Sequence, residues 1–207
     1  MEVSYFILLT VAAFCLGACP FSLWVGRRLM GKDIRDYGDG NPGAVNVFRA
    51  GGRKAGSLAL TLDIAKGTPF VVLAHSFFAL PGATVVGVAV SAILGSAFSP
   101  LLRFRGGKSI AITYGVLLAL PYPEMCLSFA IFMFLGFLFI KTHSWTVILG
   151  PTGTLAFLAA TRASYWELSF MLSVLMILAV KHHNELRTVP EFEVKLVNWL
   201  HSRRYKL

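Results

Sequence analysis

The polar side chains that could do chemistry gather in three stretches that separate long apolar runs. The first stretch, residues 31–56, is dense in Gly, Asp, Asn and Arg. Loops longer than about 12–15 residues are usually functional when they are neither repetitive nor disordered. Glycines allow backbone N–H groups to converge on an anion, and Asn41, Asn46 and Arg49 would add side-chain donors. We therefore predict an anion-binding loop; the alternative is a polar cap that only joins two helices.

The second stretch, residues 103–109, opens an apolar helix and contains two consecutive glycines. Gly106 and Gly107 would expose N–H groups at the helix N-terminus, where the helix dipole favours an anion, and Lys108 adds a positive charge. The stretch is not a P-loop, because Leu102 stands where that motif requires its first glycine. These residue types predict a phosphate site; the alternative is a pair of arginines that only set the membrane topology.

The third stretch, residues 181–187, lies where the last apolar run ends and contains His182 and Glu185. Histidine is the side chain whose unperturbed pKa lies nearest to physiological pH. His182, paired with a carboxylate and facing two phosphate loops, could therefore act as a general base. The alternative is a pair of interfacial surface histidines, and we assign no role to the isolated His75 and His143.

The sequence predicts neither a metal site nor a cofactor. Cys15, Cys19 and Cys126 lie inside apolar runs, lack metal-ligand spacing and are odd in number, which argues against a disulfide framework. Asp63 and Lys66 are three residues apart and would share one face of a helix. Because an intramembrane charge costs about 2.5–3.5 kcal/mol on insertion scales, we expect this pair to face the bundle interior and to support the polar loop.

The elements that must position these stretches are membrane helices. Of the 207 residues, 56% are hydrophobic and only 14% are charged, and the mean hydropathy is +0.69. These values argue against a soluble domain, against disorder and against a nucleic-acid-binding protein. They predict an all-α, polytopic membrane helix bundle of about seven transmembrane helices. The apolar runs cover about residues 4–26, 57–80, 82–102, 110–121, 124–140, 145–161 and 164–180, and the fourth is short for a span.

The positions of Lys and Arg predict the orientation. Seventeen of the 19 Lys and Arg residues lie on alternate connections and in the C-terminal tail, so the positive-inside rule places the N-terminus outside and the C-terminus inside. The start lacks the basic region of a cleavable signal peptide. We expect a membrane domain over residues 1–180 and a basic cytoplasmic tail over 181–207. In the tail, Phe192, Leu196 and Leu200 are spaced like an interfacial amphipathic helix; the alternative is an ordinary polar tail.

Long motifs in these stretches resemble those of a known family. Residues 31–49 read GKDIRDYGDGNPGAVNVFR, close to the pattern GKDIRxYGSGNxGATNVFR. Residues 63–67 match DxxKG, and residues 95–112 read GSAFSPLLRFRGGKSIAI, close to GHxFSPFLRFRGGKGVAT. Residues 182–187 match a third motif, near HRENIxR, only loosely. Over nearly its whole length, the chain resembles the bacterial acyl-phosphate-dependent glycerol-3-phosphate acyltransferases of the PlsY type.

The resemblance implies a multi-pass protein of the bacterial cell membrane with its active site on the cytoplasmic side. Such an enzyme transfers an acyl group from acyl phosphate to the 1-hydroxyl of glycerol 3-phosphate, giving lysophosphatidic acid for phospholipid synthesis. Direct attack by a positioned hydroxyl would need no Ser or Cys nucleophile. The resemblance implies catalytic roles for His182 as base and for Lys108, with no metal, cofactor or nucleic acid. The implied substrate-binding residues are Asp39, Asn41, Gly43, Asn46, Arg49, Gly106, Gly107, Ser109 and Glu185.

The chain departs from the family patterns at five positions. Asp39 replaces Ser, Ser96 replaces His, Ser109 replaces Gly, Ile112 replaces Thr and Glu185 replaces Asn. Asp39 and Glu185 would place carboxylates beside a bound phosphate, and like charges 4 Å apart repel by about 4 kcal/mol at an effective dielectric of 20. One rival hypothesis is therefore an altered or inactive paralogue with a binding or regulatory role. Another is a small membrane transporter, for which we detect no internal repeat symmetry.

Overall fold

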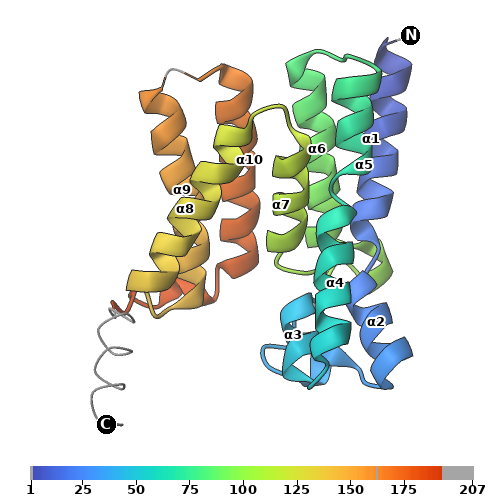
Figure 1. The fold of residues 1–207 in the computed structure, drawn as a ribbon, viewed down its shortest axis with the longest axis vertical. Coiled ribbons are helices and arrows are strands. Elements are labelled where there is room, and N and C mark those ends of the chain that lie inside the picture. The colour runs from blue at the N-terminus through green and yellow to red at the C-terminus, as the bar shows by residue number, and fades with distance from the viewer. Residues whose placement is uncertain (1, 162, 193–207) are drawn as a thin grey trace.

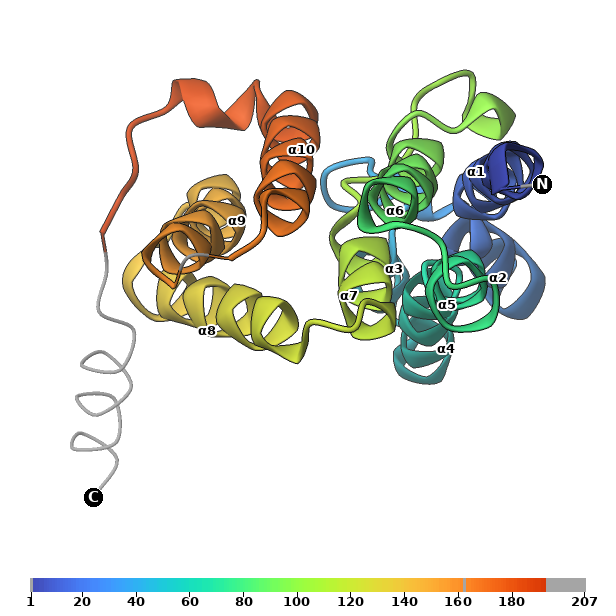
Figure 2. The same ribbon diagram turned by 90° about the horizontal axis from the view of Figure 1, so that it is seen from above.

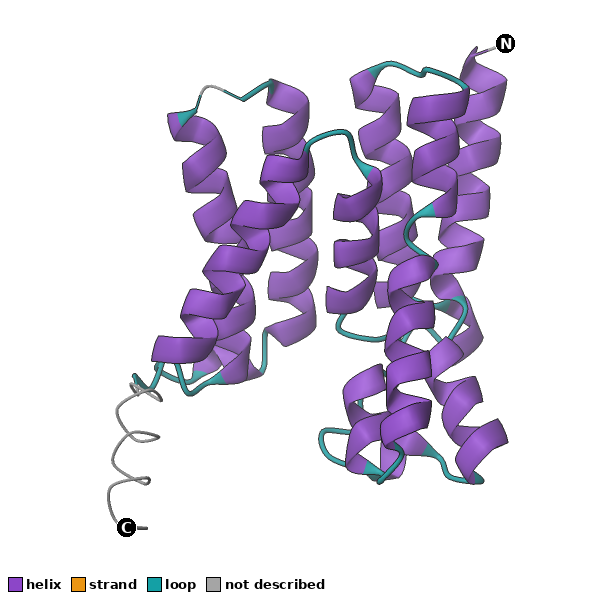
Figure 3. Cartoon of the chain, viewed as in Figure 1, coloured by secondary structure: helices purple, strands orange, loops and turns teal. Residues whose placement is uncertain are grey.

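The computed structural model describes residues 2–161 and 163–192. Within these ranges the chain is helical apart from its loops and one isolated antiparallel bridge between Ile140 and Phe192 (Figure 3). The α-helices are α1 (Glu2–Ala18), α2 (Phe21–Met30), α3 (Ala44–Arg49), α4 (Arg53–Ala65), α5 (Pro69–Val72), α6 (Gly82–Ala97), α7 (Ile110–Ala119), α8 (Pro123–Phe139), α9 (His143–Ala160) and α10 (Tyr165–His182). Short 3-10 turns are η1 (Ile34–Asp36), η3 (Pro100–Leu102) and η4 (Glu185–Arg187), and the π-helical segment η2 (Leu73–Phe77) continues α5.

Two groups of helices stand side by side, with α7 between them (Figures 1 and 2). One group contains α8, α9 and α10, and the other contains α1, α2 and α4 to α6. The groups are connected where α10 packs on α6 and where α7 contacts α4, α6 and α8. The all-α fold predicted from the sequence is therefore confirmed for the described part of the chain.

Small residues allow α1 and α6 to approach closely. A Cβ atom added to Gly95 would lie 2.2 Å from the carbonyl oxygen of Phe14, and one added to Gly17 would lie 2.1 Å from the carbonyl oxygen of Ala92. Close backbone approach through small residues is a common packing mode in membranes, where lipid removes the hydrophobic drive between helices. It makes α6 a central element of the bundle, with Ile93 fully buried.

A second, smaller apolar core holds the first polar stretch. Leu23 on α2, Ile34 on η1, Val47 on α3 and Ala59 on α4 are buried together. Burial of an aliphatic side chain of the size of Leu, Ile or Val contributes about 1.5–3 kcal/mol. Because Ile34 and Val47 lie on either side of residues 38–43, this packing anchors both ends of the loop that carries the predicted anion-binding side chains.

Among the residues that the structure describes, four helical stretches are long and apolar enough to cross a membrane: Glu2–Met30, Arg53–Phe77, Gly82–Leu102 and Tyr165–His182. Two further apolar helices, α7 and α8, are shorter. The 10 residues of α7 extend about 15 Å, roughly half of the hydrocarbon core of a bilayer, in agreement with the short fourth apolar run. The number of seven spans stays a prediction.

The first predicted run, residues 4–26, is divided at Pro20. The proline has no backbone N–H, and it separates α1 from α2. Helix α2 continues to Met30, where Gly31 adopts a left-handed conformation with φ of +63° and ends the helix. The second run is likewise divided, into α4, α5 and η2. Most of the predicted tail helix lies outside the described residues.

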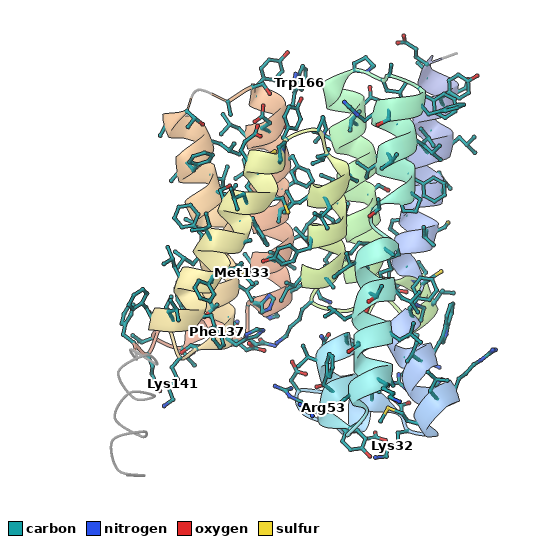
Figure 4. The ribbon with its side chains drawn as sticks, in the orientation of Figure 1. Lys32, Arg53, Met133, Phe137, Lys141 and Trp166 are labelled. Atoms are coloured by element: carbon teal, nitrogen blue, oxygen red, sulfur yellow. The ribbon has the colours of Figure 1, made fainter. Side chains whose placement is uncertain are left out.

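Basic side chains mark one end of the molecule. Figure 4 shows Lys32, Arg53 and Lys141 at the end opposite Trp166. The first and third polar stretches lie at this same end in Figure 1, the first beside α2 and α4 and the third at the end of α10. The loops that the sequence grouped on one face are therefore together in the fold.

Candidate active site

A cavity of about 460 Å³ lies beside the first two polar stretches. Its polar wall includes Asp39, Asn41, Gly43, Arg49, Gly107, Lys108 and Ser109. Its apolar wall includes Leu60 and Ile64 on α4, Ile110 and Tyr114 on α7, and Met133 on α8. The cavity can therefore receive a ligand that combines an anionic group with a hydrocarbon portion.

Asp39 lies between two glycines with left-handed backbone conformations. Gly38 has a φ of +62° and Gly40 a φ of +71°, a region that glycine enters without steric cost. Gly38 also leaves no room for a side chain, because a Cβ atom there would lie 2.3 Å from Nη1 of Arg49 and 2.5 Å from Oδ1 of Asn46. The tight turn carries the Asp39 carboxylate toward these two side chains.

The buried side chain of Asn46 organises the first loop. Its Nδ2 donates hydrogen bonds to Oδ1 of Asp39 at 2.9 Å and to the carbonyl oxygen of Asn41 at 2.8 Å. Its Oδ1 accepts a hydrogen bond from Nη1 of Arg49 at 3.1 Å, and the backbone N–H of Asn41 donates to Oδ1 of Asp39 at 3.3 Å. Gly43 caps α3 beside them. Of the side-chain donors predicted from the sequence, Asn46 and Arg49 do converge on an anion, the carboxylate of Asp39, whereas Asn41 contributes its backbone N–H.

The two glycines before α7 have different surroundings. A Cβ atom at Gly106 would lie 2.1 Å from the carbonyl oxygen of Ser96, so this glycine permits the loop to pack on the end of α6. Gly107 lines the cavity, and its N–H donates to the same carbonyl oxygen at 3.0 Å. Lys181 on α10, to which the sequence assigned no role, donates from Nζ to the carbonyl oxygens of Ala97 at 2.9 Å and Gly106 at 3.0 Å. The loop is therefore held from both helix groups.

Ser109 begins α7 in the left-handed region, with φ of +60°. The family pattern has glycine here, and an L-residue in this conformation costs about 1–2 kcal/mol. The buried Ser109 accepts a hydrogen bond at its carbonyl oxygen from Oγ1 of Thr113 at 2.8 Å. Ile112, another departure from the pattern, is buried and lines the cavity.

An ionic cluster connects all three polar stretches. Nζ of Lys108 lies 3.0 Å from Oδ2 of Asp39 and 2.6 Å from Oε1 of Glu185. Nη1 of Arg49 lies 3.5 Å from Oδ1 of Asp39, and Oγ of Ser144 at the start of α9 donates a hydrogen bond to Glu185. The two carboxylates that distinguish this chain from the family patterns thus form ion pairs with the same lysine, Lys108.

The contacts within this cluster keep its members charged. Partial burial acts to raise the pKa of Asp39, but hydrogen bonds from Lys108 and Asn46 outweigh it and lower the pKa to about 2. Burial also acts to raise the pKa of Glu185, which the hydrogen bonds from Lys108 and Ser144 bring below its usual value. For Lys108, burial acts to lower the pKa, whereas the two carboxylates raise it. All three groups are therefore ionised at neutral pH.

His182 lies behind His143, with the two ring centroids 6.4 Å apart. His182 is 1% exposed, and its Nδ1 lies 2.9 Å from the carbonyl oxygen of Leu178. That contact assigns the proton to Nδ1 and leaves the lone pair on Nε2. No group in the described part of the chain hydrogen-bonds to Nε2. His143 lines the cavity and His182 does not. The histidine at the cavity is therefore one to which the sequence analysis assigned no role.

Asp63 and Lys66 face the bundle interior, as their spacing predicted. Their side chains are 11% and 5% exposed, and Nζ of Lys66 lies 2.8 Å from Oδ1 of Asp63. Ser22 donates a hydrogen bond to Asp63, and Nζ of Lys66 donates to the carbonyl oxygen of Cys19 at 3.0 Å. This network joins α4 to the break between α1 and α2 and forms part of the cavity wall.

The fold and cavity define a class of protein. It is a helical membrane protein whose cavity is lined by cationic side chains and glycine-containing loops on one side and by apolar side chains on the other. The sequence matches the family described as glycerol-3-phosphate acyltransferase over residues 7–190. The chain belongs to the glycerol-3-phosphate acyltransferase family.

Curated relatives and solved structures agree with that assignment. The glycerol-3-phosphate acyltransferase of Listeria monocytogenes serotype 4a (strain HCC23) is 33% identical over 204 residues, covering 94% of this chain and 98% of the relative. That of Lactococcus lactis subsp. lactis (strain IL1403) is 31% identical over 198 residues, covering 92% of each. The crystal structure of PlsY, an integral membrane glycerol 3-phosphate acyltransferase, in its glycerol 3-phosphate form has a TM-score of 0.79 and 26% identity, covering 88% of this chain and 90% of that chain. Its lysophosphatidic acid form has a TM-score of 0.78.

Proposed function

We propose that this acyltransferase takes the acyl group of an acyl phosphate and transfers it to the 1-hydroxyl of glycerol 3-phosphate, giving lysophosphatidic acid and inorganic phosphate. The observation that carries the proposal is one cavity that presents Lys108 and Arg49 together with the apolar side chains of Ile110, Tyr114 and Met133. Phosphate groups require the cations, and an acyl chain requires the apolar wall. Membership of the family supports the same activity.

The proposed reaction is a direct acyl transfer. The hydroxyl oxygen of glycerol 3-phosphate attacks the carbonyl carbon of the acyl phosphate, and the bond from that carbon to the phosphate oxygen breaks. Lys108 and Arg49 would neutralise the phosphates, a positioning and electrostatic effect. The residues proposed to bind or shape the substrates are Asp39, Asn41, Gly43, Asn46, Arg49, Gly106, Gly107, Ser109 and Glu185.

His182 is the proposed base, and Nε2 is the atom that would accept the hydroxyl proton. The hydrogen bond at Nδ1 to Leu178 supports this tautomer, and Nε2 has no partner among the described residues. His182 is buried and does not line the cavity, whereas His143 does, so this role requires the two histidines to rearrange around the bound substrates.

We also propose seven membrane spans, formed by the four long stretches together with α7, α8 and α9. With the N-terminus outside and the C-terminus inside, the cavity faces the cytoplasm of a bacterial cell. Residues 1–180 would form the membrane domain and residues 181–207 the basic tail. The gathering of Lys32, Arg53 and Lys141 at one end of the molecule supports this orientation (Figure 4).

The experiment is an acyltransferase assay on the purified full-length protein in detergent, with palmitoyl phosphate and glycerol 3-phosphate. We expect lysophosphatidic acid and one equivalent of inorganic phosphate for each transfer. Phosphate release without lysophosphatidic acid would contradict acyl transfer to the glycerol hydroxyl.

A second candidate, a catalytically inactive binding protein, is favoured by one observation. Lys108 already pairs with both Asp39 and Glu185, which could exclude a substrate phosphate. This candidate predicts no turnover in the assay, together with saturable binding of palmitoyl phosphate to the same protein sample.

A further inference from the structure

The end of α10 holds the loop before α7 through one lysine, Lys181. Its Nζ donates hydrogen bonds to the carbonyl oxygen of Ala97, the last residue of α6, at 2.9 Å and to that of Gly106 at 3.0 Å. The same ammonium group lies 5.4 Å from the centroid of the Phe98 ring. Lys181 does not line the cavity, so its influence on a bound substrate passes through the loop that it holds.

The peptide unit between Gly106 and Gly107 is fixed at both of its ends. Its carbonyl oxygen accepts the hydrogen bond from Lys181, and its N–H donates to the carbonyl oxygen of Ser96 at 3.0 Å. Two consecutive glycines have wide conformational freedom, so this unit could turn if one of the two partners were lost. The next residue is Lys108, and the orientation of the peptide unit determines where its side chain begins.

The contacts of Lys181 differ from the other contact between this loop and the end of α10. Oε1 of Glu185 lies 2.6 Å from Nζ of Lys108, and a substrate phosphate that binds Lys108 must share or replace that contact. The carbonyl oxygens of Ala97 and Gly106 belong to residues outside the cavity lining. The two hydrogen bonds of Lys181 can therefore stay in place when the site is occupied.

We propose that Lys181 is a positioning residue of the acyl transfer, which fixes residues 106–108 relative to α10 and so keeps the ammonium group of Lys108 in place. The inference rests on the proposed function, and it concerns a residue outside the matched family motifs. Displacement of a binding group by about 1 Å can lower a rate by about 10²-fold. Loss of the hydrogen bonds of Lys181 should therefore affect the reaction although Lys181 touches no substrate.

The first test is the rate of lysophosphatidic acid formation from palmitoyl phosphate and glycerol 3-phosphate. Lys181→Met removes both hydrogen bonds with little change in side-chain length, and we expect it to lower kcat/KM by about tenfold or more. Lys181→Arg keeps N–H donors at this position and should restore most of the lost activity. The matched control is Lys54→Met, at an exposed position in the first turn of α4 outside the cavity lining, which should keep the wild-type value.

The same substitution in a Lys108→Met background separates positioning from general damage to the fold. Residues that act through one another have non-additive effects, so in this background Lys181→Met should lower kcat/KM by less than about threefold. Partial misfolding would instead lower kcat/KM by the same factor in both backgrounds. That result would overturn the proposal.

Hydrogen exchange provides a readout that does not depend on activity. In Lys181→Met the backbone amides of residues 103–109 should exchange faster than in the wild-type protein, whereas those of α1 should keep their wild-type rates. Unchanged exchange in the loop, or faster exchange throughout the chain, overturns the proposal. If neither Lys181 variant folds, the role of this lysine is structural only and the proposal fails.

Failure of this proposal and failure of the proposed function have different signatures. No transfer by the wild-type protein overturns the proposed function and the role of Lys181 with it. Transfer by the wild-type protein that Lys181→Met leaves unchanged overturns the role of Lys181 alone.

Discussion

Lys108 is the cation on which the proposed reaction depends most, and Lys108→Met tests it with little change in side-chain volume. An ammonium group 4 Å from a phosphate oxygen interacts by about 4 kcal/mol at an effective dielectric of 20. Each 1.36 kcal/mol corresponds to a tenfold change in rate, so loss of this contact in the transition state should lower kcat by about 10²–10³. The side chain is 16% exposed, so solvent screens the charge only weakly.

The fold should survive this substitution. Asp39 keeps its hydrogen bonds from Asn46 and Asn41, and Glu185 keeps that from Ser144. The assay is initial-rate formation of lysophosphatidic acid by protein that elutes as the wild type does in size-exclusion chromatography. The matched control is Lys54→Met, at an exposed position in the first turn of α4 outside the cavity lining, which should keep the wild-type rate.

The double variant Lys108→Met with Asp39→Ser separates two explanations of the loss. If the rate falls only because two carboxylates remain without their lysine, the second substitution removes one of them and restores activity. If the rate falls because the phosphate has lost its cation, the double variant stays at least about 10-fold below wild type, which is half of the smallest expected loss on a logarithmic scale. Retention of more than about a third of wild-type turnover by Lys108→Met would refute the assignment of Lys108.

Three further outcomes are expected. A reporter that fluoresces only in the cytoplasm, fused after Leu207, should be bright, and a dark fusion of an inserted protein would contradict the orientation. Ser109→Gly should raise the free energy of unfolding in detergent by up to about 1 kcal/mol, because glycine relieves the left-handed strain and loses part of that gain to chain entropy; a lower stability would be inconsistent with strain at this φ of +60°. The pKa of Asp39, about 2 in the fold, lies below the unfolded value of about 3.9, so its contribution to stability is complete above about pH 4 and is lost as the pH falls toward 2. The difference in thermal unfolding temperature between the wild-type protein and Asp39→Asn should therefore stay constant from pH 8 to pH 5. A change of this difference within that range would contradict the lowered pKa of Asp39.

Much of the helical framework could be predicted because each apolar run is long compared with the uncertainty of its ends. Helices α8, α9 and α10 follow the predicted runs closely. The break at Pro20 follows from local chemistry, since proline lacks the N–H that a continuous helix needs. The grouping of the three polar stretches could also be predicted, because basic residues on alternate connections place those connections on one side of a membrane.

The contacts that other residues of the chain make with the site could not be predicted from the sequence. Lys181 looks like an interfacial lysine, and only the approach of α10 to the end of α6 brings its Nζ to the carbonyl oxygens of Ala97 and Gly106. His143 and Ser144 follow a short turn after α8, and their position beside the cavity and beside Glu185 depends on how α9 packs. Such contacts depend on tertiary packing, for which a single sequence carries no periodic signal.

The two positions at which a carboxylate replaces a neutral residue of the family pattern, Asp39 and Glu185, act on the same partner in the structure. Asp39 comes from the first polar stretch and Glu185 from the third, yet both contact the same ammonium group. With Asp39 alone, Lys108 would join α7 to the first loop, and with Glu185 alone it would join α7 to the end of α10; together they connect all three. A bound phosphate could make the same connection by accepting hydrogen bonds from each side. The two carboxylates therefore organise the site around Lys108 in the way that an anionic ligand would.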